Sequence, residues 1–185
     1  MVIARVGCPW RCASASTATI SGEWATVDAV LTALSTADVA HLAAHGRLSA
    51  ENPLFSEIAL ADGPLIAYDL EQLTRVPHTV VLAACETGRA VVHTGDELIG
   101  LSATFLARGA TQLVASVVPV PDAETAPLMI AFHQRLAAGA APAAALAAAQ
   151  SELGGRTDDR TFAASAGFVC VGSGIQSVRP AATHS

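Results

Sequence analysis

The sequence predicts an α/β fold in which a mostly parallel sheet is flanked by helices and carries a small β-hairpin insertion. Two short apolar runs, residues 38–45 and 79–85, have the composition of central parallel strands that are buried on both faces. Helical patterns alternate with these and later strands, which is the order that parallel strands require. The chain of 185 residues is long enough for one domain with a substantial core.

The segment before the first strand divides into two parts. Residues 1–16 show no periodic apolar pattern, and we expect a disordered N-terminus there, with the domain itself at residues 17–176. After Gly22 apolar residues recur at helical spacing, which predicts an amphipathic helix that leads into the first strand. The residues expected on its buried face are Trp24, Val27, Val30, Leu31 and Leu34.

A β-hairpin is predicted between the two strands. Residues 56–61 and 65–68 are short apolar strands, and Asp62-Gly63 between them is a strong signal for a two-residue turn. Asp69 is expected to cap a short helix that ends at Leu73, before the second strand begins.

The second half of the chain continues the alternation of helices and strands. The sequence Thr94-Gly-Asp-Glu97 matches a capping box at the start of a helix, and Arg108-Gly109 is a typical helix end. Pro142 is favourable in the first turn of a later helix. In order, we expect a helix at 98–107, a strand at 112–118, helices at 122–136 and 142–153, a strand at 168–171 and a disordered tail at 177–185.

Composition excludes several classes of function. The net charge of −6 and the scattered basic residues argue against binding to nucleic acid. The longest run of small apolar residues, 136–149, is interrupted by Gly139 and Pro142 and does not predict a membrane span. Without a secretion signal we expect a cytoplasmic protein whose four cysteines are reduced. Cys8 and Cys12 lack the spacing of a metal site, and we expect neither a metal nor another cofactor.

The two central strands both end in residues that carry chemistry. Cys85 is the last residue of the second apolar run, and His45 closes the first, directly before Gly46. Because the carboxyl ends of neighbouring parallel strands meet at one edge of a sheet, a thiol and an imidazole are expected side by side. Nucleophilic cysteine catalysis needs that arrangement, with the backbone N–H groups of Gly46 and Cys85 as oxyanion donors. The alternative is that Cys85 is a small buried core residue, which is common for free cysteines.

Other residues fit this chemistry less well. A phosphatase-type cradle needs an arginine at position 91, where the chain has Val91, and a thioredoxin-type site needs a cysteine in place of Gly88. His41 lies inside the first strand, where a core histidine is usual, and residues 41 and 45 share one face of a strand, so His41 is also placed to lie beneath His45. His93 is a lesser candidate for the base. Solvent-facing positions are expected for His78, His133 and His184.

A series of short motifs runs through the chain in a fixed order. They are His45-Gly46, Asn52-Pro53, Ala84-Cys85-Glu86-Thr87-Gly88, Gly95-Asp96-Glu97-Leu98, Gly100-Leu101, Phe105-Leu106, Gly109-Ala110, Ala115-Ser116, Asp122, residues 145–150 and the closing residues 167–172. Together they resemble the CHAT domain, a caspase-like domain that is related to caspases and separases and is often fused to tetratricopeptide (TPR) repeats in bacteria. The resemblance implies a caspase-like fold and a cysteine peptidase in which His45 is the general base and Cys85 the nucleophile. It also implies a protein or peptide substrate and a TPR-containing or other regulatory protein acting in trans.

Two features of the sequence keep a second interpretation open. The family usually begins with a further strand and helix, which residues 1–16 do not resemble, and no repeat array is present in the chain. The alternative function is therefore an inactive CHAT fragment, truncated at its N-terminus, that acts as a protein-interaction module. Substrate preference also stays open, because Glu86 and Asp96 favour a basic side chain at the cut, whereas Arg47 favours an acidic one.

Overall fold

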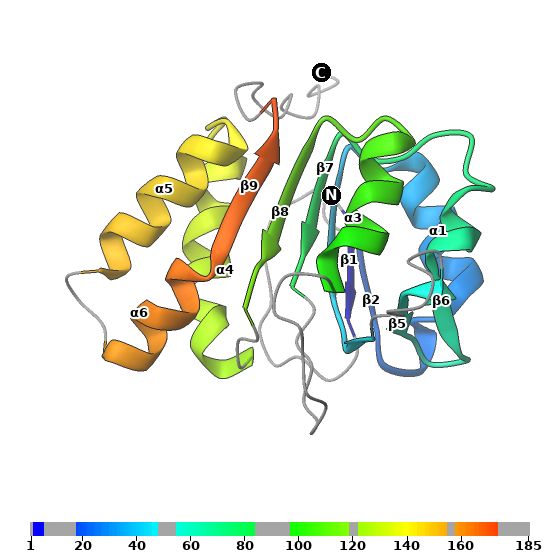
Figure 1. Cartoon of the computed structure of the whole chain (residues 1–185), viewed down its shortest axis with the longest axis horizontal. Coiled ribbons are helices and arrows are strands. Elements are labelled where there is room, and N and C mark those ends of the chain that lie inside the picture. The colour runs from blue at the N-terminus through cyan, green and yellow to red at the C-terminus, as the bar shows by residue number, and fades with distance from the viewer. Residues whose placement is uncertain are drawn as a thin grey trace, which may run out of the picture.

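The computed structural model of this chain describes residues 2–5, 18–47, 55–83, 97–118, 122–154 and 158–173. Within them a six-stranded sheet runs through the centre, with the strand order β2-β1-β3-β7-β8-β9 (Figure 1). Its strands are β1 (Val2–Arg5), β2 (Ala18–Ser21), β3 (Val39–Ala43), β7 (Thr79–Leu82), β8 (Gln112–Ser116) and β9 (Phe168–Gly172). Neighbouring strands are parallel except for β8 and β9, which are antiparallel. The predicted α/β fold with a mostly parallel sheet is confirmed.

The predicted hairpin is also present, as part of a second, three-stranded antiparallel sheet. Its strands are β4 (Gly46–Arg47), β5 (Glu57–Ala59) and β6 (Pro64–Ile66). Gly63 in the turn has a φ of 147°, a value that side chains disfavour, which explains the glycine there. Helix α2 (Ala67–Leu70) follows at once. The Asp69 carboxylate accepts the N–H of Ile66 at 3.0 Å, so it caps this helix from inside the first turn and not from the position before it.

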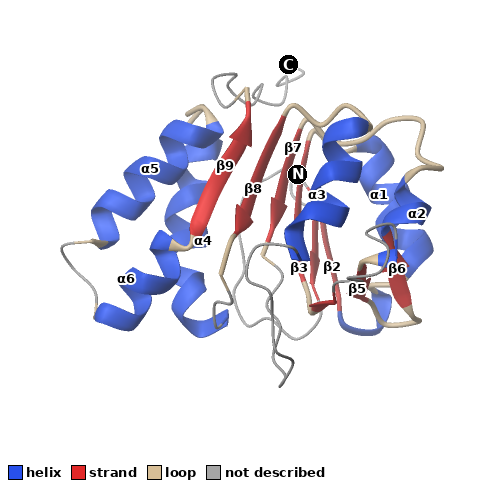
Figure 2. Ribbon diagram, viewed as in Figure 1, coloured by secondary structure: helices blue, strands red, loops and turns tan. Residues whose placement is uncertain are grey.

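Helices cover both faces of the central sheet (Figure 2). One face, here called the α1–α3 face, is covered by α1 (Val27–Thr36), α2, α3 (Glu97–Ala107) and the hairpin. The other, the α4–α6 face, is covered by α4 (Asp122–Ala137), α5 (Pro142–Leu153) and α6 (Asp159–Ala166). None of the helices in the described part of the chain combines the length and the hydropathy that crossing a membrane requires.

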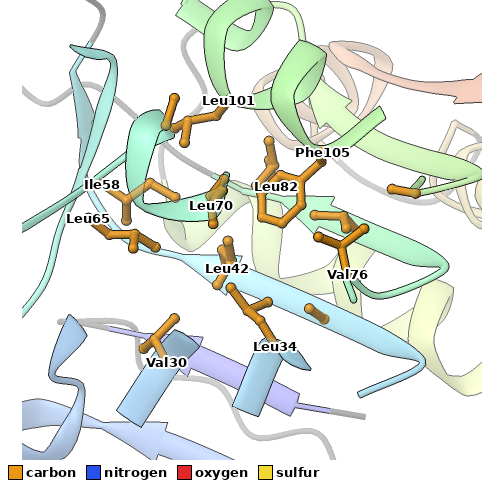
Figure 3. Packing of buried hydrophobic residues seen from close by; sticks show 14 of the residues in the cluster. Val30, Leu34, Leu42, Ile58, Leu65, Leu70, Val76, Leu82, Leu101 and Phe105 are labelled. Carbon is orange, nitrogen blue, oxygen red and sulfur yellow. The ribbon is translucent and has the colours of Figure 1, made fainter. Parts of the chain in front are cut away.

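Side chains of alternate residues in each central strand point to opposite faces of the sheet and pack into two separate cores. Leu42 of β3 and Leu82 of β7 belong to the cluster on the α1–α3 face, where Phe105 of α3 packs with them (Figure 3). Ala43, the residue after Leu42, and Val81, the residue before Leu82, belong to the cluster on the α4–α6 face. Both central strands are therefore buried on two sides, as their continuous apolar sequences predict.

The N-terminus differs from the expectation of a disordered segment. Val2–Arg5 form strand β1, which lies inside the sheet and pairs in parallel with β2 on one side and β3 on the other. The segment is only four residues long, too short to show a period of its own. Its structure is set by the two strands beside it, because pairing on both edges gives its backbone N–H and C=O groups partners on either side. The expectation that residues 1–16 are disordered is therefore wrong for Val2–Arg5.

The first helix begins later than its apolar pattern indicates. Trp24 lies in a short 3₁₀ turn, η1 (Gly22–Trp24), and its side chain is 75% exposed, so the prediction that it faces the core is wrong. The helix proper starts after Thr26, whose Oγ1 accepts the N–H of Ala29 at 3.3 Å. As predicted, the other residues of that face pack against the core: Val27, Val30, Leu31 and Leu34.

Helix α6 was not predicted from the sequence. It is eight residues long, and Asp158 caps it by accepting the N–H groups of Thr161 and Arg160 together with the Thr161 hydroxyl. The hydrogen bonds from the Thr161 N–H and hydroxyl hold the pKa of the Asp158 carboxyl below its ordinary value. The acidic cap was visible in the sequence, but the helix is too short to give a clear apolar period.

Candidate active site

The two strands that precede the predicted site residues in the chain, β3 and β7, are direct neighbours, as expected. Strand β3 pairs in parallel with β7, and the register runs from Val39 opposite Thr79 to Leu42 opposite Leu82, a constant offset of 40 positions. The pairing continues one step further, because the N–H of Ala83 donates to the carbonyl of Leu42 at 3.0 Å. In the sequence, His45 and Cys85 are separated by the same 40 positions.

His45 is held at the carboxyl end of β3 by the hairpin sheet. Its carbonyl oxygen accepts the N–H of Ala59 at 2.8 Å, and the next residue, Gly46, lies opposite Ile58 in the β4–β5 pair. The His45 side chain is exposed, whereas Gly46 is half-buried. The His45 imidazole therefore lies at the surface, at the edge of the sheet where β3 and β7 both end.

The hairpin also fixes the direction of one backbone donor. In an antiparallel pair, hydrogen-bonded and non-hydrogen-bonded positions alternate. Because His45 lies opposite Ala59 at a hydrogen-bonded position, Gly46 falls at the next, non-hydrogen-bonded one. Its N–H consequently points away from β5, and β5 does not use it.

The other predicted site residues are not placed by the structure. Cys85, Glu86 and Asp96 lie outside the described residues, and Arg47 is described only as backbone in β4. Among the described residues, no group of three or more His, Cys, Asp or Glu side chains is arranged to hold a metal ion. The candidate site is thus defined by the strand ends, His45 and Gly46.

A pair of buried histidines lies beneath this edge, on the α4–α6 face. His41 of β3 and His133 of α4 are both buried, and Nδ1 of His41 lies 2.7 Å from Nε2 of His133. The rings are stacked at a centroid distance of 4.9 Å and an interplanar angle of 25°, and Phe132 packs edge-on against His133. Since a nitrogen–nitrogen hydrogen bond needs one donor and one acceptor, the two rings share a single proton across this contact.

Burial keeps both of these rings neutral at ordinary pH. Desolvation lowers the pKa of His133 from its usual 6.5 to about 4. Desolvation and, to a smaller extent, the charge of His133 lower the pKa of His41 well below its usual value. The core position predicted for His41 is confirmed, but the solvent-facing position predicted for His133 is wrong. A signal was available, because Met129 and Leu136 lie four residues before and three residues after His133 and thus share its helix face.

The thiol of Cys170 differs from what a nucleophile requires. Cys170 lies in β9, is partly buried and packs against the core of the α4–α6 face. Burial raises the pKa of its thiol, which disfavours the reactive thiolate. The interpretation of Cys170 as a core residue is consistent with this environment.

Comparison with protein families agrees with the motifs and the fold. The CHAT domain matches residues 9–173 of the 185-residue chain, a span that starts before and ends close to the predicted domain of 17–176. A comparison with curated proteins finds none that matches. The family assignment is consistent with a caspase-like fold, and the parallel sheet with helices on both faces agrees with it. The chain therefore belongs to the CHAT domain family.

Proposed function

We propose that this CHAT domain is a caspase-like cysteine endopeptidase in which His45 is the general base and Cys85 the nucleophile. The observation that carries the proposal is the parallel pairing of β3 and β7, whose carboxyl ends lie side by side and lead into these two residues. Two peptide units separate Cys85 from Ala83, which limits the distance between their Cα atoms to about 7 Å. The proposal accordingly has the thiol act at the edge of the sheet where His45 is exposed.

The proposed reaction follows the usual two steps of a cysteine nucleophile. His45 takes the proton of the Cys85 thiol, and the thiolate attacks the carbonyl carbon of the scissile peptide bond. Collapse of the tetrahedral species breaks the C–N bond, and the leaving amine takes the proton back from His45. Water then gives a proton to His45 and attacks the thioester carbon. The C–S bond breaks, the leaving thiolate takes the proton from His45, and the new carboxylic acid loses its proton to the solvent.

Backbone N–H groups would stabilise the negative oxygen of each tetrahedral species. The N–H of Gly46 supports this role, because it points away from β5 and lies next to the proposed base. We assign the second donor to the N–H of Cys85. Two such donors in a partly desolvated site commonly lower the barrier by several kcal/mol, about 3 kcal/mol for each donor.

The substrate in this proposal is a protein or peptide, and no cofactor takes part. We place the reaction in the cytoplasm, where the Cys85 thiol stays reduced. Acidic Glu86 and Asp96 would select a basic residue before the cut, and Arg47 an acidic one. A TPR-containing or other regulatory protein would present the substrate in trans.

Cleavage of a diverse peptide library by the purified protein tests the proposal. We expect cleavage by the wild type, its loss in Cys85→Ala and in His45→Ala, and unchanged cleavage in the matched control Cys170→Ala. The residue preferred before the cut would decide between an acidic and a basic specificity. Cleavage that persists in Cys85→Ala would disprove the assigned nucleophile.

A second candidate function is a protein-interaction module that keeps the fold without cleaving. In this function a partner protein would cover some of the large exposed side chains, among them Trp24 at 75%, Phe55 at 57% and Tyr68 at 54%. Thiol alkylation separates the two functions. A dyad predicts that iodoacetamide reacts with Cys85 much faster than with Cys170, and that His45→Ala slows the reaction. Equally slow alkylation of both cysteines in a folded protein that cleaves nothing would favour the interaction module.

A further inference from the structure

The His41–His133 pair is a part of the interior that the proposed reaction does not use. Burying polar rings is unfavourable unless their hydrogen bonds are made, and apolar side chains would fill the same space without that requirement. Three positions beside the pair carry apolar side chains: Val81 lies opposite His41 on β7, and Met129 and Leu136 share the helix face of His133. The hydrogen bond between the two rings can therefore have a role that apolar packing between β3 and α4 does not provide.

The position of the pair suggests that role. His45 follows His41 by four positions, two of them beyond the last residue of β3, and the chain limits the distance between their Cα atoms to about 14 Å. After His41, the hydrogen bond from the Ala83 N–H to the Leu42 carbonyl holds the chain in the plane of the sheet. The hydrogen bond from the Ala59 N–H to the His45 carbonyl ties it to the hairpin on the α1–α3 face. The contact to His133 provides a directional link on the opposite face, to helix α4.

We propose that His41 and His133 are a positioning pair for the base: their hydrogen bond fixes β3 against α4 and thereby holds His45 in place at the end of the strand. The inference rests on the function proposed above, because it concerns how His45 is presented to the thiol and the substrate. Hydrogen bonds weaken steeply with distance and misalignment, so the pair resists a slide of β3 along α4. Apolar side chains tolerate such a slide, because their attraction has no preferred direction.

Substitutions at His133 separate the hydrogen bond from the packing. His133→Gln keeps an amide nitrogen close to the position of the histidine Nε2 and so retains a partner for His41. His133→Leu fills a similar volume without a polar group. Met129→Leu, one helical turn earlier on the same buried face, is the matched control for a change of core packing at nearly constant volume.

Kinetics on the best library peptide are expected to show a loss in turnover and not in binding. A base displaced by a fraction of an ångström lowers kcat by about tenfold in His133→Leu, with KM within about twofold of the wild type. His133→Gln should recover kcat to within about threefold. Met129→Leu should match the wild type in both constants.

A second measurement does not depend on cleavage. The ring resonances of His45 in ¹H–¹³C NMR spectra should shift in His133→Leu and stay near the wild-type values in His133→Gln and Met129→Leu. Unchanged His45 resonances in folded His133→Leu would overturn the positioning role, even if the protein is a peptidase. If the wild type cleaves nothing, the peptidase proposal fails, and the NMR comparison still decides the role of the pair. If His133→Leu does not fold, the comparison of His41→Asn with His41→Leu applies the same test from the strand side.

Discussion

The two faces of the central sheet are held together by different kinds of contact. On the α1–α3 face the large buried side chains are apolar, and Leu42, Leu82 and Phe105 pack directly on one another. Of the buried polar residues in the described part of the chain, only Ser56 and Thr104 belong to this side. The others belong to the strand positions or helices of the α4–α6 face: His41, Thr79, Gln112, Ser116, Thr125, His133, Thr161 and Ser165.

Several directional contacts on the α4–α6 face link separate elements. The side chain of Gln150 in α5 donates to the carbonyls of Ser165 and Phe168, each at 2.9 Å, and thereby connects α5 with α6 and β9. The Thr79 hydroxyl donates to the side-chain oxygen of Gln112 at 3.4 Å, which connects β7 with β8. One sheet can thus be covered by apolar packing on one face and by hydrogen-bonded contacts on the other. We therefore expect the α1–α3 face to respond most to changes of side-chain volume and the α4–α6 face to changes of pH.

The largest expected effect concerns volume on the α1–α3 face. Phe105 is fully buried, and Phe105→Ala should lower the free energy of unfolding by about 3–5 kcal/mol, because it removes apolar contact and leaves a cavity. Urea titration monitored by circular dichroism measures this. The control Phe162→Ala, on the 47% exposed Phe162 of α6, should change it by less than about 1 kcal/mol. Equal losses in both variants would contradict the burial of Phe105.

The second effect concerns pH on the α4–α6 face. An unfolded histidine takes up a proton near pH 6.5, but folded His133 does so only near pH 4. Between these values the unfolded chain binds more protons, so this contribution to stability is complete above about pH 6.5 and is lost as the pH falls toward 4. For one imidazole the loss is about 3 kcal/mol, measured as the free energy of unfolding from urea titrations across that range.

Two variants distinguish this pH dependence from general acid sensitivity. His133→Gln should remove the part of the pH dependence that is due to His133. Ile58→Val, in the apolar core of the other face, should lower the free energy of unfolding by about 1 kcal/mol at every pH and leave its pH dependence unchanged. If His133→Gln shows the wild-type pH dependence, the buried imidazole is not its source.

The smallest effect is expected for substitutions of two glycines that have the same φ angle. Gly109 follows α3 and Gly172 ends β9, and both have a φ of 105°. A Cβ at Gly109 would meet open space, whereas one at Gly172 would lie 2.2 Å from the Thr111 carbonyl oxygen. Gly109→Ala should therefore lower the free energy of unfolding by about 1 kcal/mol through backbone strain alone, and Gly172→Ala by about 2 kcal/mol or more. A smaller loss in Gly172→Ala than in Gly109→Ala would show that β9 can move away from β8.

Local patterns in the sequence were sufficient for most of the fold and for part of the candidate site. The strands that lead to His45 and toward Cys85 were predicted because buried parallel strands are continuously apolar. The hairpin was predicted because Asp62-Gly63 has the turn chemistry that its backbone requires. Strand β1 could not be predicted in this way, since four residues carry no period and its two partners lie elsewhere in the chain.

What the sequence by itself determined is most of the elements, though not β1, β2 or α6, because helix caps, turns and apolar periods depend on neighbours only a few positions away. The tertiary structure alone decided which side chains meet. Trp24 is apolar and exposed, whereas His133 is polar and buried. The usual preference of each residue type for the core or the surface predicts the reverse of both. The contact between His41 and His133 joins residues 92 positions apart, and only the packing of α4 on the sheet brings them together.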